Sequence, residues 1–312
     1  MNTVQKPIVV AGSINIDFVA TTDRIPSIGE TVRGHDFQLH PGGKGANQAV
    51  AAARLGYPVQ MIGMVGSDIF AEQMRATLRD AGVDVHAIGV ADGSSGVATI
   101  TVSRAGENAI VVTPGANGKV TPQYVELHRE VIRHAGVVLA QLEIPLETVE
   151  YLAELCSQYK VPLILDPAPA QTLPASIWPR VSWFTPNETE AAFYAGQVDA
   201  SLAGADGPSL SAAFLHRGVG AVALKLGARG VLLASANNAT ESVPALPVDA
   251  VDSTAAGDAF NGAFAVGLML GMQPGESARF ACAAAAISVT RRGAQPSMPS
   301  REEVEALLKV QV

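Results

Sequence analysis

Short apolar runs alternate with segments of helical periodicity along most of this 312-residue chain. The apolar runs predict buried strands at residues 8–12, Val59–Val65, Val137–Leu142, Pro162–Leu165, Trp183–Thr185 and Val222–Leu226. The periodic segments predict helices at Ala46–Leu55, Ala71–Ala81, Leu146–Tyr159, Ser209–Arg217, Asp258–Leu270 and Glu276–Arg291. Strands that alternate with helices of about 10–15 residues are typical of βαβ units. We therefore predict one α/β domain over residues 1–312, with a mostly parallel central sheet and helices on both faces.

Two regions, Phe18–Leu39 and Val97–Val112, break this pattern because they lack helical periodicity. Within the second region, two alternating, β-branched segments flank the turn-rich stretch Arg104–Asn108, which predicts a hairpin. We expect a small β subdomain, built from about residues 15–40 and 96–113, that could cover a cleft as a lid. The alternative is an ordinary decorated edge of the main sheet. Residues Ala200–Leu210 are expected to form a loose loop.

Composition narrows the class of protein. Hydrophobic residues make up 48% of the chain and charged residues 16%, which argues against disorder. The net charge of −8 argues against a nucleic-acid partner but leaves a nucleotide ligand open. Two distant cysteines, Cys156 and Cys282, indicate buried thiols in a reducing compartment. We find no targeting segment and no apolar run long enough for a bilayer, so we expect a cytoplasmic protein without a membrane partner.

The most informative motif is Asp252-Ser-Thr-Ala-Ala-Gly-Asp258, which precedes an apolar helix. Unpaired amides at a helix start attract anions, and a carboxylate beside them is suited to taking a proton from a hydroxyl. This layout indicates a small-molecule kinase in which Asp258 is the base. Contact between Asp252 and Asp258 would raise one pKa, so we expect Asp252 to have a separate task, such as binding a cation with backbone carbonyls.

A second motif, Gly42-Gly43-Lys44-Gly45-Ala46-Asn47, opens a predicted helix. Its spacing fits neither a Walker A loop nor a dinucleotide-binding fingerprint. The glycines allow a ligand to approach the backbone closely, and Lys44 and Asn47 offer polar contacts. The alternative is a tight turn without a ligand.

Polar residues also follow several predicted strands, where open α/β sheets bind ligands. Asn15 and Asp17 lie two residues apart on an extended segment, so they point to the same face and could hold sugar hydroxyls. Glu143 follows the strand Val137–Leu142 in the same way. The alternatives are a surface pair for Asn15 and Asp17 and a helix cap for Glu143.

Two further motifs have both structural and functional interpretations. Asn187 and Glu190 could form a capping box, or Glu190 could lie near a hydrated Mg²⁺ ion. The segment Lys225–Gly230 could be a hairpin turn, or a loop that contacts phosphate or adenine.

In this order and at these spacings, the motifs resemble the ribokinase branch of the ribokinase-like (PfkB) carbohydrate kinase family. The resemblance covers essentially the whole chain, from about Ile8 to beyond Glu303. The phrases that carry it are Gly12-Ser-Ile-Asn15-Ile-Asp17, Gly42-Gly-Lys-Gly-Ala-Asn-Gln-Ala-Val50, Thr185-Pro-Asn-Glu-Thr-Glu190, Ala255-Ala-Gly-Asp258 and Thr290-Arg-Arg-Gly-Ala-Gln-Pro-Ser297. It implies a ribokinase-like fold and ATP-dependent phosphorylation of D-ribose on its 5-hydroxyl.

The resemblance also implies roles for individual residues. The sugar would be held by Asn15, Asp17, Gly43, Lys44, Asn47 and Glu143. Asp258 would be the base, and the amides of Ala256, Gly257 and Asp258 would form an anion hole. ATP would contact Asn187, Lys225, Leu226, Gly227, Ala228, Arg229, Gly230, Gly257 and Cys282. Glu190 would organise Mg²⁺ through water, and an activating K⁺ would be bound by Asp252, Thr254, Ser288, Arg291, Gly293 and Ser297.

Small departures from the family pattern concern Ser253, Ala255 and Cys282. The last stands where a larger polar ring often flanks the adenine, so only that contact is in question. Other acceptors, namely deoxyribose, a hexose or a nucleoside, are the nearest alternatives. A sugar sensor without catalysis is a more distant one. The lid strands could pair between chains, so we expect a homodimer.

Overall fold

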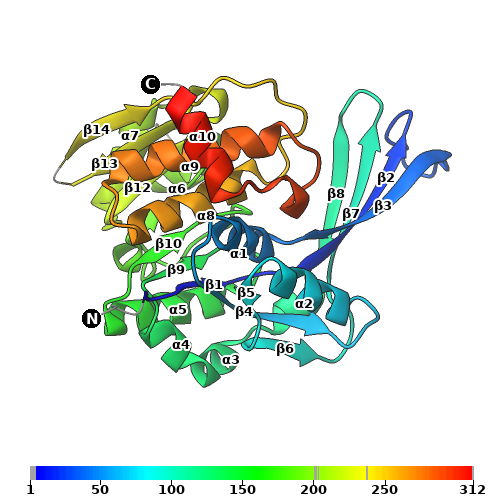
Figure 1. Ribbon diagram of the computed structural model, residues 1–312, viewed down its shortest axis with the longest axis horizontal. Helices are drawn as coiled ribbons and strands as arrows, with labels where there is room; N and C mark the ends of the chain where they lie inside the picture. Colours follow the sequence, from blue (N-terminus) through cyan, green and yellow to red (C-terminus); the bar gives the residue numbers. More distant parts are fainter. Residues whose placement is uncertain (1–4, 200–201, 203, 237, 311–312) are drawn as a thin grey trace.

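The computed structural model describes residues 5–199, 202, 204–236 and 238–310. Its main sheet has the strand order β14-β13-β12-β11-β10-β9-β1-β4-β5, and β6 also pairs with β4 (Figure 1). The pairs from β12 to β5 are parallel, whereas β13 and β14 run antiparallel at one edge. The strands of this sheet are β1 (Ile8–Ala11), β4 (Val59–Gly66), β5 (Val83–Asp84), β6 (Ile88–Ala91), β9 (Val137–Ala140), β10 (Leu163–Leu165), β11 (Trp183–Phe184), β12 (Ala221–Lys225), β13 (Val231–Ser235) and β14 (Asn238–Val243).

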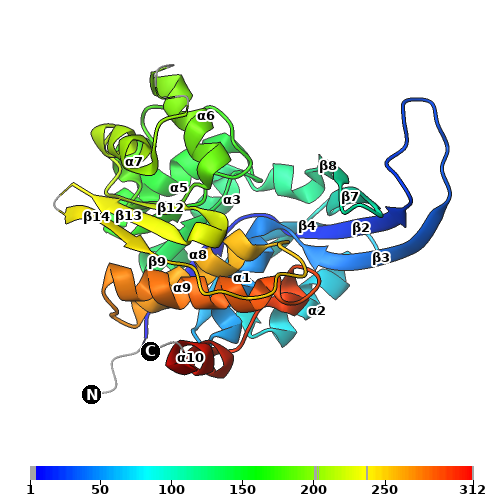
Figure 2. The same cartoon turned by 90° about the horizontal axis from the view of Figure 1, so that it is seen from above.

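Helices cover both faces of this sheet, and Figure 2 shows the two layers apart. One layer contains α1 (Lys44–Arg54), α2 (Ala71–Asp80), α8 (Ala256–Met269), α9 (Pro274–Val289) and α10 (Arg301–Val310). The other contains α3 (Pro122–Leu127), α4 (Arg129–Arg133), α5 (Leu146–Tyr159), α6 (Glu188–Val198) and α7 (Gly207–His216). Each layer has its own apolar core, because strands such as β1 are buried along their whole length and present side chains to both faces.

A second sheet extends away from this body (Figure 1). Its strand order is β3-β2-β7-β8, with bounds β2 (Asn15–Thr22), β3 (Gly34–Gly42), β7 (Gly96–Ser103) and β8 (Asn108–Thr113). We call this sheet the lid sheet. Every residue of its edge strand β8 is exposed. Asn15 and Asp17, at the start of β2, lie where the lid sheet joins the body.

The predicted fold class is confirmed, and most predicted elements lie close to the observed ones. The hairpin around Arg104–Asn108 connects β7 and β8, and α5 has its predicted bounds. The loop prediction for Ala200–Leu210 is wrong at its end, because α7 starts at Gly207, where Asp206 caps it. Part of that predicted loop lies outside the described residues. None of the described helices has both the length and the apolar content that a membrane span requires.

Candidate active site

Polar residues from several segments meet at the carboxyl edge of the main sheet, beside the start of α1. Ser13 follows β1, Glu143 follows β9 and Asp166 follows β10. The Ser13 hydroxyl donates to Glu143, whose Oε2 also accepts the backbone N–H of Lys44 at 3.1 Å. The parallel order of the strands therefore brings these residues together, as expected for the ligand-binding edge of an open α/β sheet.

Asp258, in the first turn of α8, is buried at this edge with 5% of its surface exposed. Its Oδ2 accepts from Asn47 Nδ2 at 3.0 Å, and its Oδ1 accepts from Gln48 Nε2 at 3.0 Å. Both donors come from α1, which packs against α8. The carboxylate is therefore fixed by two amide groups, with lone pairs left for another partner.

Burial raises the pKa of Asp258 to about 6, against the opposing charge of Lys44 and the hydrogen bonds from Asn47 and Gln48. The neighbouring carboxylate that adds to this rise is Asp166, so Asp252 and Asp258 do have separate surroundings. Near neutral pH the group is mostly ionised and can accept a proton.

The turn before α8 has an unusual backbone. Ala255 adopts the left-handed conformation, with φ of 58°. The amide of Ala256, one of the three expected in the anion hole, donates to the carbonyl of Ser253 at 3.2 Å. Among the described residues, the amides of Gly257 and Asp258 have no such acceptor. They lie in the first turn of α8, where they can attract an anion.

On the other side of Asp258, the predicted sugar ligands lie around the base of the lid sheet. Asn15 Oδ1 accepts from Asn117 Nδ2 at 2.6 Å, which fixes its orientation. Gly42 and Gly43 pass close to this strand: a Cβ on Gly42 would collide with Asp17, and a Cβ on Gly43 would lie 2.7 Å from Asn15 N. Glycine at these positions allows the turn before α1 to approach Asn15 and Asp17.

Charges at this edge influence one another. Burial, Glu143 and Asp258 together raise the pKa of Asp17 to about 6. Burial disfavours the charge on Lys44, but Asp258, Asp166, Glu143 and Glu190 raise the pKa of its ammonium group above the ordinary value. Lys44 therefore stays charged in the middle of a set of carboxylates.

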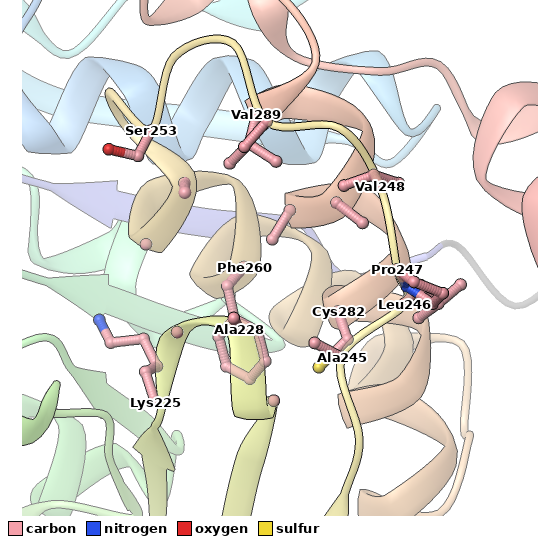
Figure 3. A pocket seen from close by; sticks show the side chains of 17 residues that line it. Lys225, Ala228, Ala245, Leu246, Pro247, Val248, Ser253, Phe260, Cys282 and Val289 are labelled. Carbon is pink, nitrogen blue, oxygen red and sulfur yellow. The ribbon is translucent and has the colours of Figure 1, made fainter.

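A pocket of about 540 Å³ lies beside the start of α8 (Figure 3). Of the residues predicted to contact ATP or the transferred phosphoryl group, it is lined by Lys225, Gly227, Ala228, Gly230, Ala256, Gly257 and Cys282. Apolar residues of 245–250, α8 and α9 complete it, and Figure 3 shows Phe260 and Val289 among them. Such a pocket, mostly apolar with a few polar groups at one end, suits a flat base attached to a phosphate chain.

Three residues predicted to contact ATP do not line this pocket. Leu226 packs against the core, and Arg229 pairs with Glu188 at the start of α6. Asn187 caps α6: its Oδ1 accepts from Glu190 N at 2.8 Å, while Glu190 Oε2 accepts from Asn187 N at 2.8 Å. The capping-box interpretation of Asn187 and Glu190 is confirmed.

The residues predicted to hold a monovalent cation belong to two neighbouring segments. Asp252 accepts from the Thr254 amide at 2.9 Å and from the Gly293 amide at 2.8 Å. The carbonyl of Val289 accepts from Val251 N and Asp252 N. Ser288 and Ser297 donate their hydroxyls to nearby carbonyls, and Arg291 pairs with Glu303. The side chain of Arg291 therefore points to another element, which leaves its backbone as the possible ligand.

The fit of metal ions to these residues can be judged from their donors. Among the described residues, no group of three or more His, Cys, Asp or Glu side chains could hold a metal ion. A Mg²⁺ ion that keeps its waters and binds phosphate needs only one or two protein carboxylates, so Glu190 fits that ion. Carbonyls and the Asp252 carboxylate offer the oxygen ligands that suit a hard cation.

Several residues of this edge are not among those predicted from the sequence. Asp166 accepts from Lys225 Nζ at 2.9 Å and from Gln48 Nε2 at 2.9 Å. Asp166 follows a strand, as Glu143 does, so the same rule could have found it. Gln48 lies next to Asn47 but gave no separate signal. The segment Ala245–Ala250, which contributes to the pocket, is irregular in structure and carries no motif.

The pfkB family carbohydrate kinase model matches residues 5–301 of the chain. This chain is a member of the pfkB family of carbohydrate kinases. The ribokinase of Bacillus subtilis (strain 168) is 42% identical over 302 residues, which cover 96% of this chain and 99% of the relative. The deoxyribokinase of Salmonella typhi is 34% identical, covering 97% of this chain and 99% of the relative.

Solved structures give the same result. The ribokinase of Thermotoga maritima has a TM-score of 0.91 and 38% identity, covering 97% of this chain and 99% of its own. The Arabidopsis thaliana ribokinase complexed with ribose and ATP has a TM-score of 0.90 and 34% identity, covering 98% of this chain and 99% of its own. This chain is thus a carbohydrate kinase with the ribokinase-like fold.

Proposed function

We propose that this enzyme transfers the γ-phosphoryl group of ATP to O5 of D-ribose and releases D-ribose 5-phosphate. The observation that carries the proposal is the position of Asp258. Its carboxylate lies in the first turn of α8, which borders the apolar pocket, and contacts Asn47 of the polar set at the lid base. Full-length similarity to ribokinases supports ribose as the acceptor.

In this proposal, Asn15, Asp17, Gly43, Lys44, Asn47 and Glu143 hold the sugar. Their donors and acceptors suit a molecule rich in hydroxyl groups. Adenine lies in the pocket lined by Cys282, and the loop Lys225–Gly230 borders the phosphate chain. Asn187 and Arg229 contribute by fixing the start of α6 beside this loop.

The proposed reaction is an in-line phosphoryl transfer. Asp258 accepts the proton of the 5-hydroxyl while the hydroxyl oxygen attacks the γ-phosphorus in line. The bond between the γ-phosphorus and the β–γ bridging oxygen breaks, and ADP leaves. The amides of Gly257 and Asp258 stabilise the negative charge that develops on the transferred group. Lys44 and Lys225 provide further positive charge at the two sides of the reaction centre. The lid sheet excludes water when it closes over the sugar.

We propose that Mg²⁺ lies near Glu190 and that K⁺ lies between the two segments that contain Asp252 and Gly293. When bound, Mg²⁺ neutralises phosphate charge and K⁺ holds the turn before α8 in shape. We also propose a cytoplasmic location, in keeping with two buried cysteines and no disulfide among the described residues, and a homodimer formed through the lid sheet.

A phosphotransfer panel with ribose, deoxyribose, fructose and adenosine tests the acceptor, with and without K⁺. We expect ribose to have the highest kcat/KM and K⁺ to raise turnover. Deoxyribose is the second candidate because a deoxyribokinase is 34% identical over nearly the whole chain. A site built around the ribose 2-hydroxyl would reject deoxyribose by up to about 10⁴-fold. A higher kcat/KM for deoxyribose or for adenosine would contradict the ribose assignment.

A further inference from the structure

Gln48 connects two carboxylates of the site. It lies on α1, is fully buried, and donates from Nε2 to Asp258 Oδ1 at 3.0 Å and to Asp166 Oδ2 at 2.9 Å. An amide nitrogen has two hydrogens, so it can donate to both carboxylates at once. The other oxygen of Asp166 accepts from Lys225 Nζ at 2.9 Å.

The orientation of the Gln48 amide matters, because ionised carboxylates only accept hydrogen bonds. If the amide were flipped, its oxygen would face two negative groups. Gln141, the residue after β9, prevents this by donating from Nε2 to Gln48 Oε1 at 2.6 Å. Gln141 is itself fully buried, so little else can compete for this contact.

Gly12 provides the space for Gln141. A Cβ at residue 12 would lie 2.1 Å from Gln141 Oε1, so any larger residue would displace this side chain. Gln141 Oε1 has no hydrogen-bond partner among the described residues. The contact with Gln48 is therefore formed although one buried oxygen of Gln141 is left without a donor, which is unfavourable by itself.

We propose that Gln48 is a positioning residue for the base Asp258, and that Gln141 sets the orientation of the Gln48 amide. This inference rests on the proposed function. Gln48 and Asn47 hold the two oxygens of Asp258, so the carboxylate cannot rotate away from the sugar hydroxyl. The donated hydrogen bond also favours the ionised form of Asp258. The other charged groups that interact with Asp258 are Lys44, Asp166 and Asp17. Glu143 in turn interacts with Lys44 and Asp17.

The test compares Gln48→Met and Gln141→Met with wild type. Methionine keeps the length of the side chain and removes its donor. We expect kcat/KM for ribose at saturating ATP to fall by about 10–100-fold in Gln48→Met. A displacement of a reacting group by about 1 Å can lower the rate by about 10²-fold. The acid limb of its pH profile should move up by about one unit. Gln141→Met should show the same changes, smaller in size.

Gln60→Met is the matched control, because Gln60 Nε2 also donates to a carboxylate, Asp84 Oδ2 at 3.0 Å, on the strands β4 and β5 away from the site. Its pH profile should superpose on that of wild type. Variants that bind ATP normally and keep the wild-type acid limb would overturn the inference. If Gln48→Met does not fold, Gln141→Met decides.

A second readout does not depend on kinase activity. Removal of the donor raises the pKa of Asp258 in the folded state, so the Gln48→Met variant binds more protons when folded. Its loss of unfolding free energy relative to wild type should therefore be larger at pH 8 than at pH 5. An equal loss at both pH values would contradict the inference. A wild-type enzyme that phosphorylates no sugar would instead contradict only the proposed function.

Discussion

At the scale of single residues, Asp258 has the clearest expected effect. Asp258→Asn keeps the shape of the side chain but cannot accept a proton. We expect kcat to fall by about 10²–10⁴-fold, the usual contribution of a positioned base. ATP affinity should change little, because Asp258 is not among the residues that line the pocket in which we propose that ATP binds. Steady-state phosphotransfer and equilibrium ATP binding measure the two effects.

Asp84→Asn is a suitable control for this variant. Asp84 also accepts from a glutamine side chain, Gln60, but it lies on β5. Its turnover should equal that of wild type. Near-normal turnover in Asp258→Asn would exclude Asp258 as the base.

The pH dependence of activity also follows from single residues. The pKa values of Asp17 and Asp258 are both raised to about 6, mainly by burial. A raised pKa means that each group is protonated below about pH 6 and ionised above it. We therefore expect kcat/KM for ribose at saturating ATP to decrease as the pH falls through 6, rather than near the ordinary value of 3.8.

Because two groups titrate together, activity should fall by about 100-fold per pH unit well below 6. In Asp17→Asn only one of them remains, and the slope should decrease to about tenfold per unit. An acid limb near pH 4 in the wild type would contradict the raised pKa values of both groups.

At the scale of elements, the sequence predicts best where periodicity is long. The helix Leu146–Tyr159 was predicted with its observed bounds, because fourteen residues carry a clear apolar face. The strand β5 has two residues and gives no pattern. The capping box at Asn187 was predicted without the helix that follows it. The site was partly predictable, because motifs mark α1 and α8, while the contact of Gln48 with Asp166 joins residues far apart in sequence.

Gly43 shows what the start of α1 requires. Its φ of 91° is unfavourable for other residues, and a Cβ would lie 2.7 Å from Asn15 N. Gly56 also has a positive φ, of 78°, but a Cβ there would meet nothing within 4 Å. Gly56→Ala should therefore lower the unfolding free energy by about 1–2 kcal/mol, from backbone strain alone. Gly43→Ala should lower it by about 1–3 kcal/mol more, because the backbone must also move.

Urea denaturation measures the unfolding free energy of both variants. Gly43→Ala should in addition raise the KM for ribose, since Asn15 is displaced, whereas Gly56→Ala should leave it unchanged. Equal loss of stability in the two variants would show that the close approach at Gly43 is not tight.

At the scale of the whole molecule, the lid sheet is the least covered part of the structure (Figure 1). Side chains alternate along its strands, so one face carries Asn15 and Asp17 together with an apolar stripe. Register places in this stripe Val19, Ile100, Ile110 and Val112. Ile110 is 53% exposed and Val112 is 49% exposed, although both are large apolar residues. An exposed apolar stripe on an open sheet is typical of a surface that another protein covers.

We expect a second copy of the chain to cover this stripe, so that two lid sheets pack against each other. Ile110→Asp would then place a charge in the interface and shift dimer to monomer, which sedimentation velocity measures. Val111→Asp is the matched control: Val111 is next in sequence and 66% exposed, but it points to the opposite face. It should leave the dimer intact. If both substitutions dissociate the dimer equally, the chains pair along the edge of β8, because edge pairing involves both faces alike. A wild-type protein that is monomeric at micromolar concentration would exclude either arrangement.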